Sequence, residues 1–218
     1  MKFTALIIGS YLLGSIPFGQ IIAAAHGKDL RTIGSGNIGA TNLARALGKK
    51  WAYLCFFLDV AKGFAPVFVS TKLLYKPPAL SELILGLAVA VAAILGHVFP
   101  IYLKFKGGKG VATSFGVALG FWPYYTICSI AVFMIWVAIV LISRYVSLAS
   151  IVASIFFPVI LIAAIALVPD WHLANLWPLL VVAAIMPTLV IIRHKENITR
   201  LANGTESKIF QKNTENLP

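Results

Sequence analysis

The chain has 218 residues, of which 60% are hydrophobic and 11% are charged, and its mean hydropathy is +0.91. A soluble domain is about 45–50% apolar and about 25% charged, so a water-soluble globule is excluded. The 18 Lys and Arg outnumber the 7 Asp and Glu, giving a net charge of +11. In so apolar a chain, this excess indicates membrane topology rather than binding to nucleic acid.

Long apolar runs predict the membrane-spanning helices. A spanning helix needs about 20 apolar residues, because the hydrocarbon layer is about 30 Å thick and each residue rises about 1.5 Å. The first run, residues 3–25, is longer than the apolar core of a secretory signal and is followed by further spans, so it is expected to be one mature helix. The runs without a charged side chain are residues 3–25, 83–103, 146–168 and 173–192.

Residues 51–71 qualify as a further span if their two charges can be accommodated. Asp59 and Lys62 stand three apart, on one face of a helix, so they can form an ion pair inside the bundle. We interpret the pair as structural.

Residues 111–143 are ambiguous, because Trp122-Pro123 interrupts an apolar run of 33 residues. The run is either one kinked helix or a short helix followed by a full one from Tyr124. With two helices, seven spans result, and 14 of the 18 Lys and Arg fall on one side, leaving Lys2, Lys72 and Lys76 opposite. With six spans the two sides hold 9 and 8, which is no bias, whereas cytoplasmic loops are normally rich in Lys and Arg.

The sequence therefore predicts an all-α, polytopic membrane bundle of seven transmembrane helices. Its N-terminus is expected outside and its C-terminus in the cytoplasm. Without repeats or a Pro- or Ser-rich linker, residues 1–218 form one domain, and residues 194–218 are expected to be a short, polar, partly mobile cytoplasmic tail.

The first loop is rich in glycine. Gly34, Gly36 and Gly39 can turn several backbone amides toward one point, which is typical of an anion site. A helix expected over residues 40–47 adds partial positive charge, and Arg45, one turn after Thr41, can reach back to an oxyanion. The glycines also match the dinucleotide pattern G-x-G-x-x-G, but no strand precedes them. A connector whose glycines merely turn the chain is the structural alternative.

The third loop, residues 106–113 (KGGKGVAT), places glycines around Lys109. A Walker A motif needs Ser or Thr directly after the lysine, and Gly110 stands there, so nucleotide hydrolysis is not supported. A glycine-lined cradle with one ammonium group is supported. From this loop alone, a tight turn in a positively charged loop is an equal alternative.

Polar residues also gather near the last two helices. If the last helix continues, His194 and Asn197 share a face at the cytoplasmic rim. Ser147 and Ser150 open the sixth span on the same side, where by themselves they would be capping or packing hydroxyls. A lone interfacial histidine is more often a hydrogen-bonded surface residue than a catalyst. No clustered carboxylates and no G-x-S-x-G motif occur, which disfavours metal-dependent transfer and a serine hydrolase.

Together these segments closely resemble the bacterial acylphosphate:glycerol-3-phosphate acyltransferase family. Similarity also extends to residues 13–18 (LGSIPF) and 57–63 (FLDVAKG), and so covers nearly the whole chain. The main matching stretches are residues 34–45 (GSGNIGATNLAR), 96–113 (GHVFPIYLKFKGGKGVAT), 144–151 (RYVSLASI) and 194–206 (HKENITRLANGTE).

The resemblance implies an integral membrane enzyme of the bacterial inner membrane with a cytoplasmic active site. It would move a fatty acyl group from acyl phosphate to the 1-hydroxyl of sn-glycerol 3-phosphate, giving lysophosphatidate and phosphate, in the first step of phospholipid synthesis. It implies two phosphate-bearing substrates and membrane lipid as partners, and no metal, nucleic acid or other cofactor.

The resemblance also assigns residues. Residues 35–42 would hold the acyl phosphate, the glycines of the third loop would let it approach the donor, and the acyl chain would lie in a groove between helices. Arg45, Lys109, Ser150, His194 and Asn197 would hold glycerol 3-phosphate, and Glu206 would be structural. The catalytic set would be Ser35, Arg45, Lys109 and His194, with His194 or a substrate phosphate oxygen accepting the hydroxyl proton. The other binding residues would be Gly34, Gly36, Asn37, Gly39, Thr41, Asn42, Gly107, Gly108, Gly110, Ser150 and Asn197.

A transporter for a phosphorylated small molecule is the main rival, because glycine-interrupted helices and cationic loops also occur in transporters. Transporters usually place their sites near the bilayer midplane between repeats, whereas these clusters lie on one rim and no repeat is visible.

Overall fold

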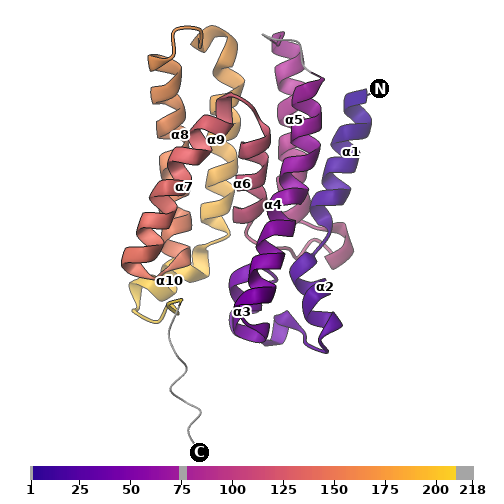
Figure 1. Ribbon diagram of the computed structural model, residues 1–218, viewed down its shortest axis with the longest axis vertical. Coiled ribbons are helices and arrows are strands. Elements are labelled where there is room, and N and C mark those ends of the chain that lie inside the picture. Colours follow the sequence, from indigo (N-terminus) through magenta and orange to yellow (C-terminus); the bar gives the residue numbers. More distant parts are fainter. Residues whose placement is uncertain (1, 74–77, 210–218) are drawn as a thin grey trace, which may run out of the picture.

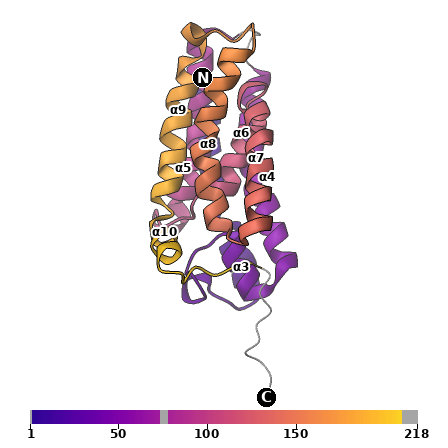
Figure 2. The ribbon, with the colours of Figure 1, turned by 90° about the vertical axis from the view of Figure 1, so that its left-hand side faces the viewer.

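A computed structural model describes residues 2–73 and 78–209, and all regular elements in these residues are helical. They form an upright bundle with two short helices, α3 and α10, at one end (Figures 1 and 2). Lys76 and Lys212, which the charge count included, lie outside the described residues. The elements are α1 (Lys2–Ser15), α2 (Phe18–Ala25), η1 (Leu30–Thr32), α3 (Ala40–Leu47), α4 (Lys49–Lys72), α5 (Leu80–Val98), η2 (Ile101–Leu103), α6 (Val111–Gly120), α7 (Tyr124–Ser143), α8 (Val146–Leu167), α9 (Leu173–Ile192) and α10 (Lys195–Ala202).

The first span is not the single helix that the apolar run predicts. It breaks at Ile16-Pro17 into α1 and α2. A proline inside a helix has no N–H to donate and pushes the preceding residue out of the helical region, so the chain changes direction there. The two pieces together still form one apolar segment of 24 residues, Lys2–Ala25, long enough to cross a membrane. The third span ends at Leu103 as expected, but in two pieces, because α5 stops at Val98 and η2 continues to Leu103.

The ambiguous run after residue 110 is two helices, a short α6 and a full-length α7 from Tyr124. Six segments in the described chain are long and apolar enough to span a membrane, and α6 is apolar but has 10 residues. At about 1.5 Å per residue, α6 covers only about half of the hydrocarbon layer. The start of α1 and α10 lie at opposite ends of the bundle (Figures 1 and 2), and a seventh crossing stays a prediction.

Glycines bring two pairs of helices into backbone contact. A Cβ atom on Gly14 of α1 would lie 2.3 Å from the Ala93 carbonyl oxygen of α5, and one on Gly96 would lie 2.3 Å from the Tyr11 oxygen. Gly116 packs α6 equally closely against Val60 of α4. Small residues at such crossings are how helices associate tightly in lipid. These crossings fix where the ends of α4, α5 and α6 lie.

The core sits between α5 and its neighbours, with buried side chains from α4, α5, α6, α7, α8 and α9. In the most apolar stretch of the span that contains α5, 61% of the residues are buried, against 22% in that of α8. The helix α5 is therefore the central one. Outward side chains such as Ile142 and Leu167 are 85% and 81% exposed, as expected for residues that face lipid.

The described part of the expected tail, residues 194–209, is folded against the bundle. The last span ends at Ile192, and a turn leads into α10 instead of a continued helix. Glu206 is buried, and the Ile209 amide donates to the Arg144 carbonyl at 2.9 Å. The last nine residues, 210–218, lie outside the described part.

Candidate active site

Four segments meet at one end of the bundle: the loop of residues 26–39, α3, the loop of residues 104–110 and α10 (Figure 1). These segments contain the glycine-rich and polar stretches in which the sequence predicts anion binding. We call residues 26–39 the first loop. Residues 104–110, which include most of the glycine-rich stretch named the third loop above, are called the second loop from here on.

The first loop is closed by one buried side chain, Asn42 in α3. Its Oδ1 accepts from the Ser35 amide at 3.0 Å. Its Nδ2 lies 3.1, 2.9 and 2.9 Å from the carbonyl oxygens of Leu30, Ile33 and Asn37. Asn42 is only 2% exposed, so its side chain shapes the loop. Substrate contact by this side chain stays a prediction.

The loop presents an open, polar surface beside the start of α3. Gly34 has a φ of +55°, and a Cβ there would lie 2.5 Å from Asn42 Oδ1 and 3.2 Å from Arg45 Cδ. Arg45 therefore lies over Gly34. In the described residues its guanidinium makes no hydrogen bond or ion pair, and neither do the hydroxyls of Ser35 and Thr41. The first amides of α3 also have no partner within their helix, so the segment can surround an anion.

Four residues hold the second loop by hydrogen bonds. The Gly107 and Gly108 amides donate to the carbonyls of Val98 and His97, at 3.2 and 3.1 Å. Arg193 donates in return to the carbonyl oxygens of Gly107, at 3.1 Å, and Gly108, at 3.4 Å. A bond from Arg31 to the Lys106 carbonyl ties the second loop to the first.

Lys109 points from this loop to α10, where its ammonium donates to Asn197 Oδ1. Burial lowers the pKa of Lys109 to about 8, with Glu206 and Glu196 opposing the shift and Arg200 and Arg45 adding to it. Arg45 and Lys109 thus share one electrostatic environment, which favours a bound dianion.

Glu206 connects the tail to the bundle. Its Oε1 accepts from Ser147, at 2.7 Å, and Asn197, at 2.6 Å, and its Oε2 accepts from Arg200 at 2.6 Å. Burial raises the pKa of Glu206, but the hydrogen bonds from Ser147, Asn197 and Arg200 outweigh it, so the pKa is lowered and the carboxylate is charged. Its contacts fit the expected structural role.

His194 is 3% exposed, in the turn between α9 and α10. Its Nδ1 lies 2.7 Å from the Val190 carbonyl oxygen, so Nδ1 carries the hydrogen and Nε2 keeps a free lone pair. Burial lowers the pKa of His194 to about 4, and the nearby Lys109 charge adds to the shift. The imidazole is therefore neutral at pH 7 and only weakly basic.

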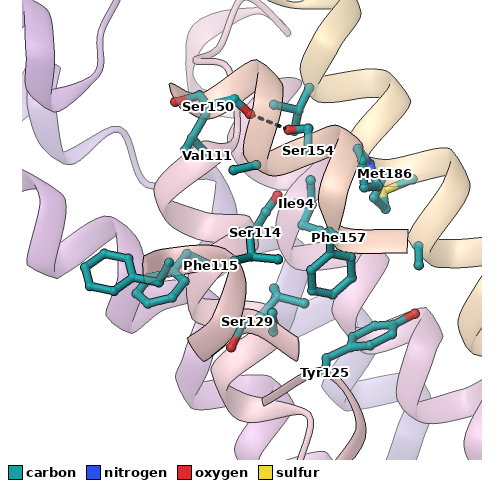
Figure 3. Close-up of a pocket in the computed structure, with 18 of the residues that line it drawn as sticks. Ile94, Val111, Ser114, Phe115, Tyr125, Ser129, Ser150, Ser154, Phe157 and Met186 are labelled. Carbon is teal, nitrogen blue, oxygen red and sulfur yellow. Dashed lines mark hydrogen bonds between the residues drawn. The ribbon is translucent and has the colours of Figure 1, made fainter. Parts of the chain in front are cut away.

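An apolar cleft of about 130 Å³ runs into the bundle between α6, α7, α8 and α9 (Figure 3). Apart from four serines its lining is apolar or aromatic. Ser150 and Val111 lie at one end, Ser129 and Tyr125 at the other, and Phe157 between them (Figure 3). Because Val111 follows the second loop directly and the lining residue Val190 binds His194, the cleft begins beside the polar site.

The structure thus gathers the predicted site residues at one end, on α3, the two loops, α8 and α10. Ser150 is more enclosed than its role as a phosphate ligand suggests: its hydroxyl donates to the Val146 carbonyl at 2.8 Å and accepts from Trp136 at 3.2 Å. Sequence reasoning missed Arg193 and Arg31, which it treated only as topology charges. Their bonds reach across 86 and 75 residues of the chain, which no local pattern reveals.

Comparison with known proteins identifies the family. The profile of the family "Glycerol-3-phosphate acyltransferase" matches residues 4–204. The glycerol-3-phosphate acyltransferase of Aquifex aeolicus is 44% identical over 208 residues, which is 95% of this chain and 100% of the relative. That of Geotalea daltonii is 44% identical over 206 residues, covering 93% and 95% of the two chains.

Solved structures agree. The crystal structure of PlsY (YgiH), an integral membrane glycerol 3-phosphate acyltransferase, in its glycerol 3-phosphate form matches with a TM-score of 0.83 and 41% identity, covering 95% of this chain and 96% of that one. Its lysophosphatidic acid form matches with a TM-score of 0.80 at the same identity, covering 95% of each chain. The chain therefore belongs to the glycerol-3-phosphate acyltransferase family of integral membrane enzymes.

Proposed function

We propose that this acyltransferase takes its acyl group from acyl phosphate and transfers it to the 1-hydroxyl of sn-glycerol 3-phosphate, releasing phosphate and lysophosphatidate. The observation that carries the proposal is the junction of a cationic, glycine-lined site with an apolar cleft. An acyl phosphate has the same two parts, an anionic head and a hydrocarbon tail. The cleft would hold the tail without passing it through water.

The head of the donor would lie on the first loop. The amides of Ala40 and Thr41 at the start of α3, the Ser35 hydroxyl and amides of the loop backbone can donate hydrogen bonds to a phosphate or to the oxyanion of the tetrahedral intermediate. Phosphate is already a good leaving group, so the protein mainly has to position the reactants and neutralise charge.

Glycerol 3-phosphate would bind between α3, the second loop and α10. Arg45 and Lys109 supply the cations for its phosphate. Asn197 and Ser150 would complete the site, although each already has a partner in the protein and would have to exchange it for substrate.

In the reaction, the glycerol hydroxyl oxygen forms a bond to the acyl carbonyl carbon. The bond from that carbon to the phosphate oxygen breaks, and its electron pair leaves with phosphate. The hydroxyl proton goes either to His194 Nε2 or to a phosphate oxygen. A pKa of about 4 makes His194 a poor general base near pH 7, so we favour the phosphate oxygen and give His194 the role of a hydrogen-bond acceptor.

Replacement of His194 separates these roles. Because Gln retains a hydrogen-bonding group without a basic nitrogen, His194→Gln is expected to keep kcat within about threefold while KM for glycerol 3-phosphate rises. Steady-state kinetics with each substrate varied in turn measures this. A fall of kcat by about 100-fold or more with unchanged KM would assign the proton transfer to His194.

We also propose that the site end faces the cytoplasm of a bacterial cell. The described Lys and Arg outside the bundle lie mainly at that end, on the two loops, α3 and α10, which agrees with the positive-inside rule. The loops at the opposite end carry too few charged residues to reverse this excess of Lys and Arg.

The decisive experiment supplies purified protein in detergent with palmitoyl phosphate and glycerol 3-phosphate in the presence of EDTA. We expect stoichiometric lysophosphatidate and inorganic phosphate, detected by mass spectrometry and a phosphate assay. Product formed only from an acyl thioester would overturn the proposed donor. No product from any donor, together with uptake of glycerol 3-phosphate into liposomes that hold the protein, would favour the transporter.

A further inference from the structure

Three ionisable side chains are buried together in the membrane-spanning part, behind the second loop. Asp59 and Lys62 of α4 are each 3% exposed, and His97 of α5 is 6% exposed. Lys62 Nζ lies 2.7 Å from Asp59 Oδ1, and His97 Nδ1 lies 3.7 Å from the same oxygen. None of the three takes part in the chemistry proposed above.

Lys62 reaches the break in the first span. Its ammonium donates to the Ile16 carbonyl at 2.7 Å, and it lies 5.5 Å from the centre of the Phe18 ring. Pro17 leaves this turn with fewer helical hydrogen bonds, so an outside donor is needed to fix it. Lys62 thus anchors the joint from which α2 leads into the first loop.

The side chain of His97 packs against the second loop at Gly108. A Cβ atom on Gly108 would lie 2.2 Å from His97 Nε2 and 3.0 and 3.1 Å from the adjacent ring carbons. The Gly108 backbone therefore lies directly on the imidazole ring. Its amide also donates to the His97 carbonyl, so side chain and backbone of one residue both fix this glycine.

Asp59 lies between Lys62 and His97. One carboxylate oxygen faces the Lys62 ammonium and the His97 ring, and the other lies 3.7 Å from Cys55 Sγ. Removing one partner of a buried ion pair is costly because it leaves the other charge uncompensated. The carboxylate therefore holds Lys62 by an ion pair, and the His97 ring lies beside the same oxygen without a hydrogen bond to it.

We propose that Asp59, Lys62 and His97 form a positioning cluster that sets the two phosphate-binding loops at their working separation. Lys62 fixes the approach to the first loop and His97 fixes Gly108, the residue before Lys109. The cluster touches no substrate and acts through the loops, so its loss weakens binding of glycerol 3-phosphate rather than slowing the chemical step. This inference rests on the proposed binding of that substrate between α3, which follows the first loop, the second loop and α10.

Two variants test the proposal. His97→Ala removes the support under Gly108. Asp59→Asn combined with Lys62→Met removes both charges together, so that no uncompensated charge remains buried if a single variant fails to fold. For each we expect the Kd for glycerol 3-phosphate, measured by titration calorimetry in detergent, to rise about tenfold or more, while kcat at saturating substrate stays within about threefold. His97→Gln, which refills the space with a planar polar group, should restore Kd to within about threefold.

Ser10→Ala is the matched control. Ser10 is 1% exposed and its hydroxyl joins α1 to α5 by a 2.8 Å bond to the Val89 carbonyl, away from both loops. It should lower Tm without changing Kd. An unchanged Kd in folded His97→Ala and in the folded double variant, or an equal rise in Ser10→Ala, would overturn the proposal. Calorimetric binding needs no acyl donor, so this result is independent of whether acyl phosphate is the donor.

Discussion

The first and second loops of the candidate site are both rich in glycine, but they are held in different ways. The first loop is organised from within: Asn42 binds four backbone groups that lie no more than 12 residues away. The second is held from outside, by Arg193 and Arg31 across 75 to 86 residues and by the ring of His97. A local motif thus builds one half of the site, and the packing of the bundle builds the other half.

Because the two loops are held in different ways, they should respond differently to substitution. The first loop depends on one side chain whose loss leaves several buried groups unpaired, whereas the second shares its support among several residues. Substitutions should therefore have the largest effect in the first loop and graded effects in the second.

The largest effect is expected from Asn42→Ala. It leaves the Ser35 amide and three carbonyls without their partner, at about 1–3 kcal/mol for each group that stays unsatisfied, so the loop should lose its shape. We expect kcat/KM to fall about 100-fold or more, with a lower Tm. Asn203→Ala, at an exposed position after α10, is the control and should change neither. Near-normal kcat/KM in Asn42→Ala would show that the loop does not depend on this residue.

Arg45→Ala and Lys109→Ala test whether the two cations act on substrate. Each should lower kcat/KM at least about tenfold, equivalent to about 1.4 kcal/mol of transition-state binding. Lys195→Ala removes an exposed charge from the start of α10 and should have little effect. If either of the first two variants is folded and kinetically normal, its residue does not belong to the site.

Arg193→Met tests the outside support of the second loop. The loop loses two hydrogen bonds, to the Gly107 and Gly108 carbonyls, but keeps its amide bonds and the His97 ring. We expect KM for glycerol 3-phosphate to rise several-fold and kcat to change little. An effect as large as that of Asn42→Ala would mean that the second loop also depends on a single contact.

The pH dependence of substrate affinity gives the smallest and most specific effect. With a pKa of about 8 in the free enzyme, Lys109 is a cation below pH 8 and loses its charge above it. A bound phosphate dianion favours the charged form, so affinity should be highest near pH 7, begin to fall as the pH approaches 8 and fall further above it. KM for glycerol 3-phosphate should rise several-fold by pH 9 in the wild type, and Lys109→Met should lack this rise. A wild-type KM that stays level to pH 9.5 would contradict the assignment.

Much of the architecture follows from the sequence, because a span is a local property. Residues 173–192 match α9 at both ends, and residues 146–168 and 51–71 match α8 and α4 to within two residues. Charge counting separated α6 from α7 and correctly favoured a short helix followed by a full one. The sequence did not predict the break at Pro17, since hydropathy is blind to backbone direction, or the folded tail, whose stability comes from contacts of Glu206 with α8 and α10.

By itself, the sequence determined the apolar spans, the predicted α3 helix and the identity of the polar segments, since these depend on composition and spacing within a few turns. Only the tertiary structure decided that Lys109 meets Asn197, that an apolar cleft opens beside them, and that Asp59, Lys62 and His97 lie behind the second loop. The physical reason is distance along the chain. Close backbone contact at glycines, where α1 crosses α5 and where α4 crosses α6, sets how the helices align, and that alignment brings together side chains that no local pattern connects.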